Sequence, residues 1–152
     1  MTKTIYDPSP AGYCLPPASA FSGFTTTGDA TDNLQEVRAD LDRGFVRGGW
    51  FYTDDSRMET IFFPTQGNRN ATEGRLYGVE EIAYAFYWTA GQGYFPYYGY
   101  SFYFYAYGDS RDGYAYMDPR YCYHVSCGYP VRPVRRLPRR SVTMVVNVSR
   151  GA

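Results

Sequence analysis

The chain has 152 residues, which is enough for one domain with a modest core and too little for two full-sized ones. Fifteen basic and fifteen acidic side chains cancel, so the net charge gives no reason to expect a nucleic-acid partner. Its purely apolar runs are short, and the N-terminal residues lack the pattern of a signal peptide, so we expect no membrane insertion.

The first part of the chain predicts two helices. Pro17 stands where a first helical turn tolerates proline, ahead of a short helix over residues 18–24. Asn33 and Glu36 have the spacing of a capping box, and Gly44 would end the second helix. The apolar face of that helix would consist of Leu34, Val37 and Leu41.

The middle of the chain predicts short strands and a loop. Residues 50–52 and 60–63 are rich in strand formers, and Pro64 stops the second run. Residues 66–74 are polar and contain glycine, which favours a loop. Residues 100–107 alternate with a period of two and predict a further strand. Its buried face would carry Phe102, Phe104 and Ala106, and its other face Tyr103, Tyr105 and Tyr107.

Aromatic side chains crowd the region between residues 84 and 129, which holds 14 Tyr, 4 Phe and 1 Trp. So many tyrosines exceed what a small core can bury, and Tyr, Ser, Gly and Asp on loops beside a strand are typical of a binding surface. The alternative is that these tyrosines only pack against one another. The positions that we expect to face a ligand are Tyr94, Phe95, Tyr97, Tyr98, Tyr107, Asp109, Ser110, Asp112, Tyr114, Tyr121, Tyr123 and His124. The expected scaffold positions are Phe102, Phe104, Trp88, Tyr129 and Val131.

Cysteine and histidine do not form a recognisable metal or catalytic motif. Cys14, Cys122 and Cys127 allow at most one disulfide, and the sequence leaves open whether Cys122 and Cys127 form it. The single histidine, His124, lies between two of them, but the tetrahedral ligand set of a structural zinc ion is incomplete. Neither a nucleophilic triad motif nor a glycine-rich phosphate loop is present. We therefore expect no metal, no cofactor and no enzymatic activity.

The charges are unevenly distributed along the chain. Residues 1–129 carry nine basic and fifteen acidic side chains, whereas residues 130–152 carry six Arg and no acid. This pattern favours a basic segment that docks on an acidic body or is solvated beside it. Prolines interrupt any helix that would present the arginines as a stripe to nucleic acid. Within residues 137–152, the alternation over residues 141–149 predicts one more strand.

Three short motifs carry a resemblance to a known family. Residues 5–16, IYDPSPAGYCLP, resemble the "YDPCPxGWRVPT" opening of small surface domains common in Bacteroidetes. Residues 87–89 resemble the "YYWSS" segment of that family, and residues 128–135 resemble its closing "GFSVRCVR". The resemblance implies an α+β domain over residues 1–136 with a C-type lectin-like fold. This fold has two helices, a twisted antiparallel sheet and adjacent N- and C-terminal segments.

The chain departs from that family at positions that matter. Ser9 and Pro133 stand where the family often has Cys, and the calcium-binding motifs of sugar-binding C-type lectins are missing. Some members of the family are variable proteins of diversity-generating retroelements, which randomise adenines in the gene. Such randomisation of AAC codons excludes Lys, Glu, Gln, Trp and Met, and residues 94–127 contain none of these except Met117.

Together, composition and resemblance predict a non-enzymatic, receptor- or adhesin-type binding protein with a diversified tyrosine-rich surface over residues 94–127. Its partner would be a protein or glycan on another cell or surface, and its location would be extracellular, on a cell surface or on a phage virion. Assembly into a larger surface or virion structure is compatible with that location, and the sequence leaves the oligomeric state open. The alternative is a structural subunit or tip module of a surface fibre, pilus or phage tail.

Overall fold

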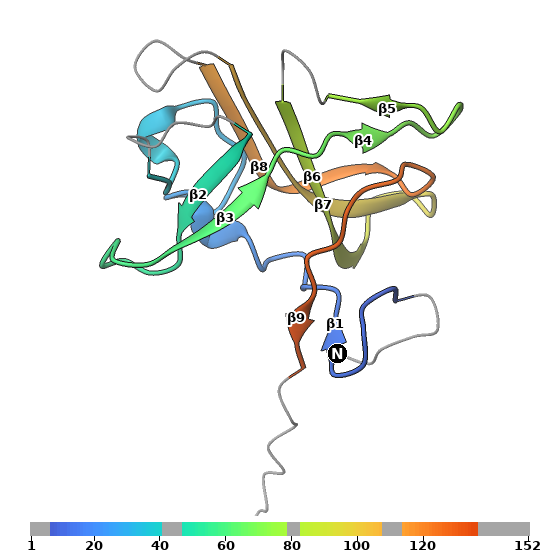
Figure 1. The fold of residues 1–152 in the computed structure, drawn as a ribbon, viewed down its shortest axis with the longest axis horizontal. Coiled ribbons are helices and arrows are strands. Elements are labelled where there is room, and N and C mark those ends of the chain that lie inside the picture. Colours follow the sequence, from blue (N-terminus) through green and yellow to red (C-terminus); the bar gives the residue numbers. More distant parts are fainter. Residues whose placement is uncertain (1–6, 41–46, 79–82, 108–113, 137–152) are drawn as a thin grey trace, which may run out of the picture.

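The computed structural model describes residues 7–40, 47–78, 83–107 and 114–136. Within these ranges the chain forms nine β-strands and two short 3-10 turns (Figure 1). The turns are η1 (Ser22–Phe24) and η2 (Leu34–Glu36). The strands are β1 (Tyr13–Cys14), β2 (Gly48–Tyr52), β3 (Thr60–Pro64), β4 (Asn68–Arg69), β5 (Leu76–Tyr77), β6 (Ala83–Gln92), β7 (Tyr98–Tyr107), β8 (Tyr114–His124) and β9 (Val134–Arg135).

The expected α+β, C-type lectin-like fold with two helices is wrong, because the described residues contain no α-helix. In the first predicted helix, only Ser22–Phe24 is helical, and Phe24 N closes the turn on Phe21 O at 3.0 Å. The rings of Phe21 and Phe24 are both buried in the core. The backbone is extended at Thr25, which pairs with Val37, so the helix does not continue past Phe24.

The second predicted helix ends after a single turn. Asn33 does cap it, since its side chain accepts a hydrogen bond from Gln35 N at 3.0 Å. Glu36, however, accepts from Thr31 Oγ1 at 2.6 Å instead of completing a capping box. Val37 then pairs with Thr25, and Ala39 pairs with Phe51. Val37 and Ala39 are buried at alternate positions, so extended backbone buries both where a helix would not.

A three-stranded antiparallel sheet, β6–β7–β8, forms the centre of the molecule (Figure 1). The β2–β3 hairpin packs on one side of it, and the small β4–β5 hairpin lies on the other. The predicted strands over residues 50–52, 60–63 and 100–107 are confirmed as parts of β2, β3 and β7. The predicted loop over residues 66–74 is interrupted by the two residues of β4.

Phenylalanine rings fill the core on one face of the sheet. Phe102 is fully buried, and its ring centroid lies 4.9 Å from that of Phe21 and 5.4 Å from that of Phe63. Phe104, also buried, lies 5.1 Å from Phe51. The predicted burial of Phe102 and Phe104 is therefore confirmed. This core is formed by residues of η1, β2, β3, β6, β7 and β8 together.

The opposite face of the sheet is also covered with aromatic rings. Phe86 is buried between Tyr103, at 4.4 Å, and Tyr129, at 4.6 Å, with nearly parallel planes. Trp88 stacks on Tyr129 at 4.4 Å, which confirms both as scaffold residues. We call this layer the tyrosine face; its remaining members are Tyr84, Tyr105, Tyr116 and Tyr121. Tyr103 is therefore a half-buried packing residue and not part of a free surface.

The two ends of the described chain lie side by side. β1 pairs antiparallel with β9, with Tyr13 opposite Arg135 and Cys14 opposite Val134. Arg136 N continues the pairing with a hydrogen bond to Gly12 O at 2.9 Å. The adjacency of the end segments, expected from the resemblance, is thus found in the structure. The predicted strand over residues 141–149 lies outside the described residues.

Candidate ligand-binding surface

The turn between β6 and β7 projects aromatic side chains from the end of the central sheet. The turn is closed by hydrogen bonds from Gly93 N to Tyr98 O at 2.7 Å and from Tyr98 N to Phe95 O at 3.0 Å. The exposed fractions of Tyr94, Phe95 and Tyr97 are 84%, 55% and 53%. These rings are held by a hydrogen-bonded turn, yet they remain open to solvent.

The end of β8 adds two rings to this turn. Tyr98 pairs with His124, whose ring lies 4.6 Å from that of Tyr98 and 5.6 Å from that of Tyr97. Val125 N also donates to Tyr97 O at 3.0 Å. Tyr123, next to His124, is 41% exposed. We call the resulting group the aromatic tip; it consists of Tyr94, Phe95, Tyr97, Tyr98, Tyr123 and His124.

The other predicted site residues lie elsewhere. Tyr121 belongs to the tyrosine face, where its ring lies 4.8 Å from that of Tyr103 with the planes tilted by 40°. Tyr107 pairs with Tyr114 at the far end of β7 and β8. At ~3.3 Å per residue, β7 spans about 30 Å between Tyr98 and Tyr107, so the backbone of Tyr107 and Tyr114 lies far from the aromatic tip. Asp109, Ser110 and Asp112 lie outside the described residues.

A concave surface adjoins the aromatic tip, and the sequence did not predict it. It is a cleft of about 560 Å³ between the loop at residues 29–30 and the strands β7 and β8. We call it the polar cleft; its lining residues are Asp29, Ala30, Tyr94, Tyr100, Asp118, Arg120, Tyr121 and Cys122. Its two walls are contributed by segments 91 residues apart, which are joined where Arg120 meets Asp29. No local sequence motif predicts such a site.

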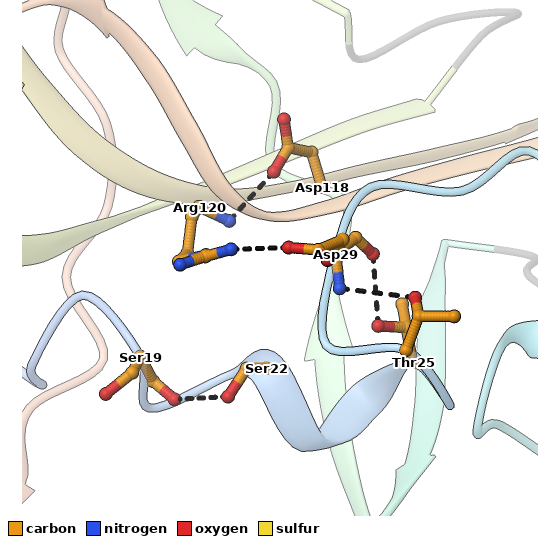
Figure 2. Close-up of polar contacts among 7 residues, drawn as sticks. Ser19, Ser22, Thr25, Asp29, Asp118 and Arg120 are labelled. Atoms are coloured by element: carbon orange, nitrogen blue, oxygen red, sulfur yellow. Dashed lines mark hydrogen bonds and ion pairs between the residues drawn. The ribbon is translucent and has the colours of Figure 1, made fainter. Parts of the chain in front are cut away.

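Charged side chains from both walls of the polar cleft meet (Figure 2). The guanidinium of Arg120 forms an ion pair with the carboxylate of Asp29. The backbone N–H of Arg120 donates to Asp118 Oδ1 at 2.9 Å. Burial raises the pKa of Asp118, while this hydrogen bond and the positive charge of Arg120 oppose the rise. The cleft therefore combines two carboxyl groups with one fixed cation.

The described cysteines are free thiols. Cys14 and Cys127 are buried, and Cys122 is half-buried on the wall of the polar cleft. Among residues 7–40, 47–78, 83–107 and 114–136, no three His, Cys, Asp or Glu side chains gather as a metal ion would require. Over the same ranges, no helix has the length and hydropathy to span a bilayer.

Comparison of the chain with protein-family models, with curated proteins and with solved structures gave no match. The candidate sites therefore depend on their own geometry and chemistry.

The conformation of the aromatic tip depends on the lack of a side chain at Gly93. A Cβ added there would lie 2.7 Å from Tyr98 Cβ and closer still to Cys122 Sγ. We expect Gly93→Ala to displace the tip and to destabilise the fold by about 1–3 kcal/mol, as overpacking does. The matched control is Gly23→Ala, because a Cβ at Gly23 meets no atom within 4 Å. Thermal melts would compare the two variants, and equal melting temperatures would contradict this account of the turn.

Proposed function

We propose that this protein is a non-enzymatic binding domain that contacts its partner through the aromatic tip. The observation that carries the proposal is the exposure of Tyr94, at 84%, and of its neighbours Phe95 and Tyr97 on a single turn. Val125, 56% exposed beside them, extends the same apolar patch. Exposed apolar patches of this kind mark interaction sites, and buried tyrosines dominate the energy of many interfaces.

The tip suits binding because its rings already pack against one another without a partner. Phe95 and Tyr97 lie parallel, with centroids 5.9 Å apart, and Tyr97 stacks in turn on His124. Ordered aromatic side chains lose little conformational entropy on binding, so more of the contact energy appears as affinity. The tip carries no Lys, Arg, Asp or Glu, which favours a protein or glycan surface of low charge as the partner.

The side chains of the tip can vary without disturbing the core of the domain. The phenylalanine core around Phe102 uses none of the tip residues. Side chains at the tip can therefore change while the fold persists, which is what a diversified binding surface requires. We place such a domain on the outside of a cell or a virion, in keeping with the family resemblance of residues 5–16.

Sequence variation in the encoding gene tests this proposal. Among sibling copies of the gene, we expect substitutions to concentrate at the tip codons, such as those of Phe95 and Tyr97, and to spare Phe102 and Phe104. We also expect a reverse transcriptase gene near these copies, beside a near-copy of the gene segment that encodes the tip. An invariant tip in a protein that forms filaments would contradict the proposal and favour a structural subunit.

A display library tests the same surface directly. Randomising the six tip positions and selecting on hen lysozyme should yield folded binders, because the tip is supported by a separate core. The matched library randomises six positions of the tyrosine face, among them Phe86 and Tyr103, and should mostly lose folded protein. Loss of folding in the tip library would show that the tip packs the domain instead of serving a partner.

A further inference from the structure

The polar cleft has the size and the mixed chemistry of a small-ligand site. Its volume of about 560 Å³ lies within the ~300–1,000 Å³ that such sites occupy. Its lining combines tyrosine rings with charged side chains, and converging polar groups of this kind fix the orientation of a ligand. Only Tyr94 belongs to both the polar cleft and the aromatic tip.

We propose that the polar cleft binds a neutral saccharide directly, without a metal ion. The first support comes from the rings. Tyr94 and Tyr100 meet edge to face, with centroids 6.1 Å apart and planes at 74°. Both tyrosines line the cleft. The electron-rich face of a tyrosine attracts the weakly positive C–H groups of a sugar ring.

The second support comes from the pairing of hydrogen-bond donors with acceptors. A sugar hydroxyl donates one hydrogen bond and accepts others, so it is best satisfied where both kinds of partner lie together. Arg120 supplies N–H donors, and the carboxylate of Asp29, held against it, supplies acceptors (Figure 2). The side chains of Arg120 and Asp29 are 52% and 67% exposed, so each retains hydrogen-bonding capacity for a ligand.

The third support comes from the charge balance, which disfavours charged ligands. An anion entering the cleft would meet the carboxyl groups of Asp29 and Asp118, and a cation would meet the guanidinium of Arg120. Like charges brought together in this way oppose binding. The ion pair of Arg120 with Asp29 and the hydrogen bond from Arg120 N to Asp118 already engage these charged groups, so an uncharged polar ligand fits best.

Binding of saccharides to the whole protein, measured by two-dimensional NMR in EDTA, tests this inference. The neutral probes are tetrasaccharides of glucose, mannose, galactose and N-acetylglucosamine, and the charged probes are sialyllactose and spermidine. We expect at least one neutral probe to shift the resonances of Tyr100, Arg120 and Ala30, with neither charged probe doing so. Failure of all four neutral probes at 10 mM, or binding of a charged probe in the cleft, would overturn the proposal.

Two variants locate the binding. Arg120→Gln should weaken it at least tenfold, because the guanidinium donors are lost. Ala30→Phe adds a ring to the lining of the cleft while both side chains of the ion pair are kept, and it should abolish binding even if the first variant is destabilised. The control, Tyr97→Ala at the aromatic tip, should leave saccharide binding unchanged. If Tyr97→Ala abolishes saccharide binding and Ala30→Phe does not, the cleft is not the saccharide site. If Tyr97→Ala abolishes only the binding of the protein's partner, that result bears on the proposed function of the aromatic tip and not on the cleft.

Discussion

Phe102→Ala should lower the free energy of unfolding by about 3–5 kcal/mol, whereas the identical change at Phe95 should alter it by less than ~0.5 kcal/mol. Phe102 has no exposed surface and lies among the rings of Phe21, Phe51 and Phe63, so alanine would leave a cavity in the centre of the core. Phe95 is 55% exposed on the aromatic tip. The two variants remove the same atoms from the scaffold and from the candidate site.

Urea denaturation followed by circular dichroism would measure both values. Small domains have total stabilities of about 5–15 kcal/mol, so Phe102→Ala could leave little folded protein. In that event Phe102→Leu, a milder change, keeps the comparison measurable. A cost at Phe95 as large as that at Phe102 would show that the tip is part of the core, and the proposed binding surface would be wrong.

Alkaline pH should destabilise the fold steeply once it exceeds about 10. Burial raises the pKa values of Tyr87, Tyr103 and Tyr129 well above the usual value for tyrosine. For Tyr103 the neighbouring tyrosines add to this effect, and for Tyr129 so does Cys127. The neutral phenols are therefore strongly preferred in the folded state.

The sign of the effect follows from the protons bound in each state. Above pH ~10 the unfolded chain loses these phenolic protons while the folded chain keeps them, so unfolding becomes more favourable as the pH rises. Each such tyrosine contributes at most about 1.4 kcal/mol per pH unit, and the contribution is fully present below pH ~10. Several tyrosines acting together should make the alkaline transition cooperative.

Absorbance of the phenolate and circular dichroism, recorded together from pH 8 to 13, would check this expectation. A set of tyrosines should ionise only as the fold is lost. Tyr103→Phe removes one of these groups and should make the loss of stability with pH shallower. Ionisation of all tyrosines in one gradual step, with the fold intact, would contradict the burial of Tyr87, Tyr103 and Tyr129.

The strands could be predicted from the sequence because their signals are local. The alternation in residues 100–107 defines β7 and the burial of Phe102 and Phe104 without any knowledge of their neighbours. Aromatic, glycine-containing composition likewise indicated the aromatic tip, where Phe95 and Tyr97 are only two positions apart. Predictions of this kind hold in the folded protein because they depend on residues close together in the chain.

The helices were predicted wrongly because their local signals do not distinguish a helix from a single turn. The Asn33 cap forms in both, and only the pairing of Val37 with Thr25 and of Ala39 with Phe51 selects extended backbone. These partners are distant in sequence or belong to another hairpin. Tertiary packing thus overrode a helical propensity that is weak over so few residues.

By itself, the sequence determined that the chain has an aromatic, strand-based core and more tyrosine than that core can bury. The tertiary structure alone decided which tyrosines are exposed. Tyr103 is half-buried against Phe86, whereas Tyr94 remains 84% exposed at the tip. It also brought Arg120 to Asp29 across 91 residues and so created the polar cleft. The physical reason is that burial and charge pairing are properties of contacts, and these contacts join segments that no local pattern relates.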